Sequence, residues 1–284
     1  MIQGPLPSDS MNMRTGFGCW QLGGNGWKDA QKEESVKAAC YAVRRGVRLF
    51  DTAPVYGFGE SERLLGTVER ETGVKLTVAT KCGLVRRNGR VTHDLSHDSI
   101  LSECEQSLER LGRAHIDLYQ LHWPDPATGI TESTRALCRL LDEGLVKRIG
   151  ACNFPVDMLD VLAKEIPLTS CQGCFNYIQR DAAKEIIPWC KRHGVIFIAY
   201  SVLAQGILTP DITAPYSFTK RDIRRLNPLY TEPSSLSRAV RTRSELGNDP
   251  VRGAYDFVLN NGADIALTGT SRTEHVKHIL DILP

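Results

Sequence analysis

The fold is decided by the stretch Val47-Arg-Leu-Phe-Asp51-Thr-Ala-Pro-Val-Tyr56-Gly57. It begins as a short apolar run after Gly46 and ends in a proline turn, which is typical of a buried strand that passes into a loop. Asp51 therefore stands at the carboxyl end of the strand, and Tyr56 follows on the loop. In a barrel of parallel strands, this end carries the active site. Taken alone, Asp51 is better explained as a cap of the following helix, so the functional interpretation depends on the other strands.

The same pattern of a strand followed by a helix recurs along the chain. Short apolar strands begin near residues 16, 47, 76, 116, 147, 170, 195 and 265, and segments with apolar residues at helical spacing lie between them. This alternation predicts an α/β fold. A chain of 284 residues fits one closed (β/α)8 TIM barrel, a single domain over residues 1–284, better than an open doubly wound sheet. We expect residues 1–13 to form a flexible N-terminal tail.

Local signals predict the limits of several elements. Asp98, Asp181 and Asp249 are expected to cap helices that run to about residues 110, 192 and 260. Helices are also predicted over 235–246 and 250–260. Residues 203–233 are interrupted by prolines, which predicts a long loop after the seventh strand. We expect that loop to cover a bound ligand.

Composition and charge exclude several classes of partner. Apolar residues make up 42% of the chain, and no apolar run approaches the roughly 18 residues of a membrane span. A formal charge of +2 is too small to indicate nucleic acid binding. Nine cysteines without framework spacing, and an N-terminus unlike a signal peptide, indicate reduced thiols in a cytoplasmic protein. The CxxC from Cys171 to Cys174 is interpreted as core, so no metal site is expected.

Polar residues end consecutive strands. Asp51 with Tyr56, then Lys81, then His122 follow the second, third and fourth strands, and a barrel brings such neighbours to one mouth. The set suits proton donation to a carbonyl. Tyrosine has a pKa of about 10, and the Lys81 cation is expected to lower it. Asp51 would hold Lys81 charged, while His122 would either donate a hydrogen bond to the substrate oxygen or relay a proton. A structural Asp51–Lys81 ion pair is the alternative, and the combination of all these residues argues against it.

The strands and the turns after them contain the motifs Leu49-Phe-Asp51-Thr-Ala-Pro-Val-Tyr56-Gly, Thr80-Lys81, Ile116-Asp-Leu-Tyr-Gln-Leu-His122-Trp-Pro-Asp and Ile149-Gly-Ala-Cys-Asn153-Phe. These motifs resemble the aldo-keto reductase superfamily, and the likeness runs from about Gly16 to about Ile279. It is closer to the bacterial general-stress and sugar-associated branches of that superfamily than to its steroid-reducing branch. The resemblance implies a (β/α)8 barrel that binds NADP(H), with NAD(H) as the alternative, and reduces an aldehyde or ketone by direct hydride transfer. It implies Tyr56 as general acid, tuned by Lys81 and Asp51, with His122 orienting the carbonyl. The lack of a GxGxxG turn agrees with nucleotide binding outside a Rossmann domain.

The same resemblance assigns the nucleotide contacts. It implies that Asn153 and Gln172 bind the nicotinamide carboxamide and that Tyr200 stacks on the nicotinamide ring. Ser271 and Arg272 are implied to bind the adenosine 2′-phosphate, because a guanidinium fork matches phosphate geometry. Pro210-Asp211 replaces the glycine and lysine usual in the pyrophosphate loop, which removes one cation. The full set of expected cofactor-binding residues is Cys19, Trp20, Asp51, Cys152, Asn153, Gln172, Tyr200, Ser201, Leu203, Gln205, Gly206, Gly269, Thr270, Ser271, Arg272 and His275.

The expected substrate is a small carbonyl or sugar-like molecule. The residues expected to contact it are Trp20, Trp27, Tyr56, His122 and Trp123. Two other function classes stay open. A lyase or aldolase would form a Schiff base on Lys81, which requires a neutral lysine, whereas the neighbouring Asp51 raises the lysine pKa. A nucleotide-binding regulatory module with slow turnover is the other, and the intact catalytic set argues against it.

Overall fold

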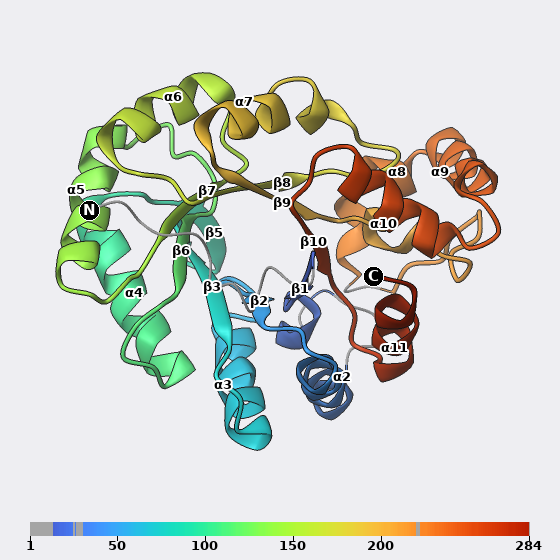
Figure 1. The fold of residues 1–284 in the computed structure, drawn as a ribbon, viewed down its shortest axis with the longest axis horizontal. Coiled ribbons are helices and arrows are strands. Elements are labelled where there is room, and N and C mark those ends of the chain that lie inside the picture. Colours follow the sequence, from blue (N-terminus) through green and yellow to red (C-terminus); the bar gives the residue numbers. More distant parts are fainter. Residues whose placement is uncertain (1–13, 25, 27–30, 220–221, 284) are drawn as a thin grey trace.

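The computed structural model describes residues 14–24, 26, 31–219 and 222–283, and its centre is a closed barrel of eight parallel strands (Figure 1). The strands follow one another around the barrel in chain order, and β10 pairs with β1 to close it. They are β1 Thr15–Gly18, β2 Leu49–Asp51, β3 Thr77–Cys82, β6 Leu118–Leu121, β7 Ile149–Cys152, β8 Ser170–Cys174, β9 Ile196–Tyr200 and β10 Ile265–Thr268. The predicted (β/α)8 TIM barrel is confirmed. The expected tail, residues 1–13, lies outside the described residues.

Helices cover the outside of the barrel (Figure 1). They are α2 Lys32–Arg44, α3 Glu60–Thr72, α4 His97–Leu111, α5 Ile130–Asp142, α6 Val156–Glu165, α7 Ile186–His193, α10 Pro250–Asn260 and α11 Thr273–Ile282. None of the helices in the described part of the chain combines the length and the apolarity needed to cross a membrane.

The predicted helix caps have mixed outcomes. Asp249 caps α10 as predicted, because its carboxylate accepts the backbone N–H groups of Val251 and Arg252. The prediction for Asp98 is wrong, since α4 begins one residue earlier and the Asp98 carboxylate lies against the His97 ring. The prediction for Asp181 is also wrong, since it begins a separate short turn, η2 Asp181–Ala183, ahead of α7.

Side chains alternate between the outer and inner faces of the barrel strands, so the strands contribute to two separate apolar clusters. Phe50 on β2 points outward into the large core between the sheet and the helices. The barrel interior holds a smaller apolar cluster, made of Leu49, Ala79, Leu118, Ile198, Ile265 and Leu267. Two residues beyond Leu49, Ala79 and Leu118, and therefore on the same inner face, come Asp51, Lys81 and Gln120. The apolar cluster thus lies one inward-facing layer below these polar side chains and supports them.

A hairpin that the sequence analysis did not predict follows β3. Its strands are β4 Leu84–Arg87 and β5 Arg90–His93, which pair antiparallel and lie outside the barrel sheet. Asn88 and Gly89 join them with φ values of 49° and 79°. Left-handed conformations at both turn residues are those that an Asn-Gly hairpin turn requires.

The prediction of a plain loop over 203–233 is wrong in part. This segment contains η3 Ala204–Gly206, η4 Ile223–Leu226 and α8 Pro228–Thr231, and the next predicted helix is divided into α9 Pro233–Arg241 and η5 Thr242–Leu246. Described residues of this segment pack into an apolar cluster of their own, which includes Ile207, Leu208 and Tyr230 together with Leu236 of α9. Its Ile223 N–H donates to the Gly26 carbonyl at 2.7 Å, which ties it to the turn after β1.

Candidate active site

A cavity of about 1630 Å³ opens at the carboxyl end of the barrel. Ligand pockets typically measure roughly 300–1,000 Å³, so this one has room for a dinucleotide together with a small substrate. Every barrel strand contributes to its wall, either from the strand end or from the following segment. One such residue for each strand, in chain order, is Trp20, Tyr56, Leu84, His122, Asn153, Gln172, Ser201 and Gly269.

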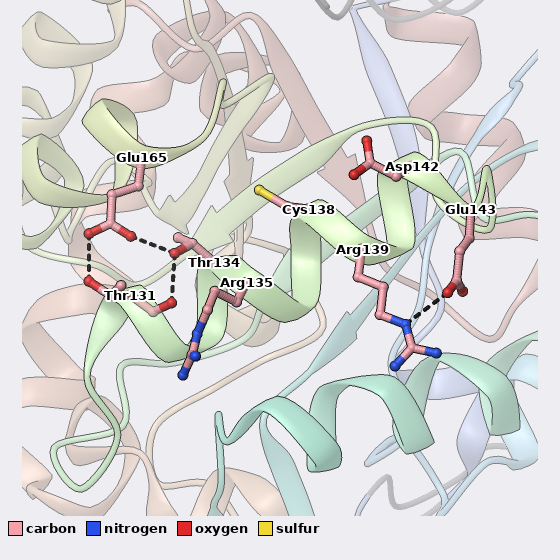
Figure 2. Close-up of a pocket in the computed structure, with 8 residues that line it drawn as sticks. All are labelled: Thr131, Thr134, Arg135, Cys138, Arg139, Asp142, Glu143 and Glu165. Atoms are coloured by element: carbon pink, nitrogen blue, oxygen red, sulfur yellow. Dashed lines mark hydrogen bonds and ion pairs between the residues drawn. The ribbon is translucent and has the colours of Figure 1, made fainter.

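A second groove lies on the outer surface of α5 (Figure 2). Several of its polar side chains bond to one another: Thr131 and Thr134 donate to the Glu165 carboxylate, and Arg139 donates to Glu143 at 2.8 Å. The cavity at the barrel mouth is larger than this groove, and it lies at the carboxyl ends of the strands, where the active sites of such barrels are found. That cavity is therefore the candidate active site.

Lys81 is the centre of the hydrogen-bond network beneath this cavity. Its buried Nζ donates to Asp51 Oδ1 at 2.6 Å, to the Thr52 carbonyl at 2.9 Å and to Tyr56 Oη at 3.4 Å. Burial opposes the ammonium charge, but the Asp51 carboxylate and Tyr56 outweigh it and raise the pKa of Lys81. Lys81 is therefore a cation at neutral pH.

The second oxygen of Asp51 is held by two amides. Gln172 Nε2 donates to Asp51 Oδ2 at 2.8 Å, and Gln120 Nε2 donates to the same oxygen at 3.2 Å. Oδ1 is thus left to Lys81. The sequence analysis missed Gln120, although strand alternation from Leu118 to His122 placed it on the inner face.

Tyr56 is held between aromatic rings at the cavity wall. The Trp20 ring stacks on it at 5.9 Å between centroids, and the His122 ring meets it edge-on at 5.9 Å. Burial raises the pKa of Tyr56 to about 12, and the Lys81 cation only partly offsets this. The expectation of a lowered pKa is therefore wrong, because desolvation of the phenolate exceeds the attraction of the cation. The phenol keeps its proton at neutral pH.

His122 is a neutral group in this site. Burial, and then the charges of Lys81 and His93, lower its pKa well below the usual value. The side chain of Asn153 donates to the His122 carbonyl at 3.0 Å, which fixes the end of β6 against β7. A neutral imidazole has one ring N–H, which can donate to a carbonyl oxygen.

Most of the residues expected to bind the cofactor line the cavity. Those on the wall are Trp20, Asp51, Asn153, Gln172, Tyr200, Ser201, Leu203, Gln205, Gly206, Gly269, Thr270, Ser271, Arg272 and His275. Cys19 and Cys152 do not reach it, because both are completely buried in the core at the ends of their strands. Burial also raises the pKa of the Cys152 thiol, so it stays uncharged. Of the expected substrate contacts, Trp20, Tyr56, His122 and Trp123 line the cavity, and Trp27 lies outside the described residues.

The far end of the cavity has mixed charge. Arg272 stands at the start of α11, whose N-terminus favours an anion. His275 lies 3.6 Å from the carboxylate of Asp211, and both line the cavity. Asp211 occupies the position where the resemblance implied a lysine, so a carboxylate stands where a cation was expected.

The outer rim of the cavity is apolar. Phe58, Leu84, Val91 and Trp123 line it, and neither Phe58 nor the hairpin residues Leu84 and Val91 were identified from the sequence. The signal available for the hairpin was the Asn88-Gly89 turn, which is typical of a two-residue hairpin connection, between two short segments that each contain a valine.

The fold and the site together define a (β/α)8-barrel protein that carries a tyrosine beside a buried lysine–aspartate ion pair at the mouth of the barrel. Comparison with known proteins supplies the family. The sequence model of the Aldo/keto reductase family matches residues 14–284, and the chain belongs to this family. Aldo-keto reductases use nicotinamide cofactors.

Relatives and solved structures agree with this assignment. Aldo-keto reductase YhdN of Bacillus subtilis is 32% identical over 281 residues, which cover 95% of this chain and 84% of the relative. NADH-specific methylglyoxal reductase of Escherichia coli is 34% identical over 229 residues, 75% of this chain and 70% of the relative. The solved structure of glycerol dehydrogenase AKR11B4 from Gluconobacter oxydans has a TM-score of 0.87 and 33% identity, covering 95% of this chain and 86% of that chain.

Proposed function

We propose that the protein reduces an aldehyde or ketone to an alcohol with NADP(H), and that Tyr56 is the general acid. One observation supports this most strongly: Tyr56 Oη lies 3.4 Å from Lys81 Nζ on the wall of a cavity large enough for a dinucleotide. A protonated phenol beside a fixed ammonium is ready to donate its proton and to be stabilised as a phenolate afterwards.

The residues present fit a nicotinamide nucleotide. The wall runs from Tyr56 and His122 past the Asn153 and Gln172 side chains to Arg272. Amides of this kind match a carboxamide, and a guanidinium at a helix start matches a phosphate. When bound, the nucleotide supplies the hydride.

The chain's own residues perform the proton transfer. The neutral His122 imidazole donates a hydrogen bond to the carbonyl oxygen and orients it toward Tyr56. Tyr56 Oη gives its proton to that oxygen, and the negative charge left on the phenolate is stabilised by Lys81. Asp51 keeps Lys81 charged and in place, because its Oδ1 accepts from Nζ at 2.6 Å.

The alternatives receive less support. A Schiff base requires a neutral amine, whereas the pKa of Lys81 is raised. For a regulatory module with slow turnover, the complete set of Asp51, Tyr56, Lys81 and His122 would have no role.

Cofactor preference and substrate are further parts of this proposal. We infer NADP(H) from Ser271 and Arg272, with NAD(H) as the alternative, which the Asp211 carboxylate and the NADH-specific relative favour. The substrate class is a small carbonyl or sugar-like molecule, since relatives are named for methylglyoxal and glycerol. All nine cysteines are free thiols, which supports a reducing, cytoplasmic location.

Fluorescence titration of the purified protein with NADPH and NADH, followed by a panel of carbonyls monitored by loss of reduced nucleotide, tests the proposal. We expect binding of at least one nucleotide and turnover of at least one aldehyde. Nucleotide binding with no turnover across the panel would favour the regulatory module. Borohydride trapping of a carbonyl on Lys81 would favour the lyase.

A further inference from the structure

Glu62 is a buried carboxylate whose two oxygens both have partners. It lies in the first turn of α3, and its side chain is 0% exposed. Thr80 Oγ1 on β3 donates to Glu62 Oε1 at 2.7 Å, and Arg110 Nε on α4 donates to Oε2 at 2.5 Å. A buried carboxylate is costly unless it is paired and hydrogen-bonded, so the folded chain holds Glu62 in this geometry. The start of α3 is thereby tied to both β3 and α4.

The same turn of α3 closes the loop that carries Tyr56. The Ser61 N–H donates to the Tyr56 carbonyl at 3.2 Å, and the Gly59 N–H donates to the Pro54 carbonyl at 2.7 Å. At the other end of the loop, Thr52 Oγ1 lies 2.8 Å from the Ser61 hydroxyl. Because these bonds join both ends of the loop, the position of Tyr56 depends on the start of α3.

Thr80 precedes Lys81 on β3. Alternation along the strand places the Lys81 side chain inside the barrel and the Thr80 side chain outside it, toward α3. The hydrogen bond from Thr80 therefore joins the backbone beside Lys81 to Glu62. Glu62 in turn follows Ser61, which bonds to Tyr56. This path closes at the active site, where Tyr56 Oη lies 3.4 Å from Lys81 Nζ.

Gly59 leaves room for Arg110 beside the loop. Its φ is 88°, and a Cβ at this position would lie 2.4 Å from Arg110 Cδ. The Arg110 side chain is only 14% exposed, and its Nη2 also donates to Ser107 Oγ at 3.2 Å. The lack of a side chain at Gly59 thus lets the guanidinium reach Glu62 from α4 and hold its second oxygen.

We propose that Glu62 is a positioning residue that sets the distance between Tyr56 Oη and Lys81 Nζ. It acts through Thr80 on one side and Ser61 on the other. Neither Glu62 nor Thr80 lines the cavity, so neither acts on a ligand directly. The importance of the distance for catalysis rests on the proposed reductase function, because the Lys81 cation stabilises the phenolate less as the two groups separate. The alternative is an ion pair that only joins α3 to α4.

Thr80→Val tests this assignment, because it removes the hydroxyl and keeps the shape of the side chain. We expect kcat for aldehyde reduction to fall about five- to tenfold, with nucleotide dissociation constants within about twofold of wild type. The ratio of kcat in H2O to kcat in D2O should rise, because proton donation by Tyr56 becomes slower. Thr80→Ser keeps the donor and should restore kcat. The matched control is Thr134→Val, which removes a buried hydroxyl that donates to Glu165 on the outer surface (Figure 2) and should keep the wild-type kcat.

Crystal structures of the wild-type protein and of Thr80→Val give a measurement that does not depend on turnover. We expect the distance from Tyr56 Oη to Lys81 Nζ to be longer in the variant by about 0.5 Å or more. An unchanged distance would overturn the positioning role, and so would a Thr80→Val variant with the wild-type kcat or the wild-type ratio in D2O. A Thr134→Val variant that loses as much activity would also overturn it. Nucleotide binding by the wild-type protein without turnover of any aldehyde would instead overturn the reductase function, and the two crystal structures would still decide the positioning role.

Discussion

We expect Gln120→Met to lower kcat about tenfold. Gln120 is completely buried on β6, and its Nε2 donates to Asp51 Oδ2 at 3.2 Å. A hydrogen bond to a charged group contributes about 1.5–3 kcal/mol, and the long distance places this one at the lower end. Methionine has a similar length and no donor. If the loss of about 1.5 kcal/mol from the group that holds Lys81 raises the barrier by the same amount, the rate falls by about a factor of ten.

Folding stability should change little in this variant, because two effects oppose each other. The lost hydrogen bond destabilises the fold. However, Gln120 Oε1 is buried without a hydrogen-bond partner among the described residues, and such a group costs about 1–3 kcal/mol. Methionine removes that cost. Gln120 is also absent from the cavity wall, so KM and the nucleotide dissociation constants should stay at their wild-type values.

The variant Gln120→Glu distinguishes loss of the hydrogen bond to Asp51 from a change in how the side chain packs. A glutamic acid has nearly the same shape, but it donates to Asp51 only while it is protonated, and the Asp51 carboxylate raises its pKa. Its kcat should therefore recover toward the wild-type value as pH falls, whereas that of Gln120→Met should not. Steady-state kinetics across pH measures kcat for each variant, and urea unfolding measures its folding stability. The reasoning fails if Gln120→Met keeps the wild-type kcat, or if the two variants have the same pH profile.

Three further variants test other parts of the structure. Tyr56→Phe removes the acid and little volume, so nucleotide binding should persist while kcat falls about 10²–10⁴-fold; a fully active variant would exclude Tyr56 as the donor. Arg272→Ala should raise the dissociation constant for NADPH about tenfold and that for NADH little, by fluorescence titration; equal changes would show that Arg272 does not contact the 2′-phosphate. Glu103→Gln tests stability, since burial raises the pKa of Glu103 to about 7 from 4.5. The unfolded chain releases this proton more easily, so stability is lost as pH rises from 4.5 toward 7 and stays low above it. Glutamine keeps an acceptor for the Gly83 N–H and cannot ionise, so urea unfolding should show a gain of about 3 kcal/mol at pH 8 and less than about 1 kcal/mol at pH 5, whereas an equal gain at both would refute the assignment.

The sequence alone predicted the barrel and the positions of Asp51, Tyr56, Lys81 and His122 at the strand ends. These features can be predicted because they depend on residue patterns within single strands and the turns that follow them. A strand alternates every two residues and ends where turn residues begin, so the inner face and the strand end can both be identified without the rest of the molecule. Barrel closure then follows from the number of strands and the length of the chain.

What the sequence did not predict depends on contacts between distant segments. Asp51 Oδ2 accepts hydrogen bonds from Gln120 on β6 and Gln172 on β8, two strands that only barrel closure brings near β2. The pKa of Tyr56 depends on how far the folded chain excludes water, and that effect exceeded the charge of Lys81. Prolines in residues 203–233 were interpreted as helix breakers, yet Pro228 and Pro233 begin α8 and α9, where a missing N–H has no cost.

The buried Lys81–Asp51 ion pair depends on the apolar cluster inside the barrel, and the same alternation along the strands places both. Separating Lys81 and Asp51 from water costs several kcal/mol for each ion, and their attraction offsets this only where geometry is fixed and the remaining oxygens are bonded. The apolar layer of Leu49, Ala79 and Leu118 supplies the rigid support, and the next inward position on each strand supplies Asp51, Lys81 and Gln120. A flexible support would let Lys81 move from Tyr56, and the phenolate would then form without its cation. In the proposed mechanism, the packing two residues below the site therefore contributes to catalysis, because it holds the charged groups in place.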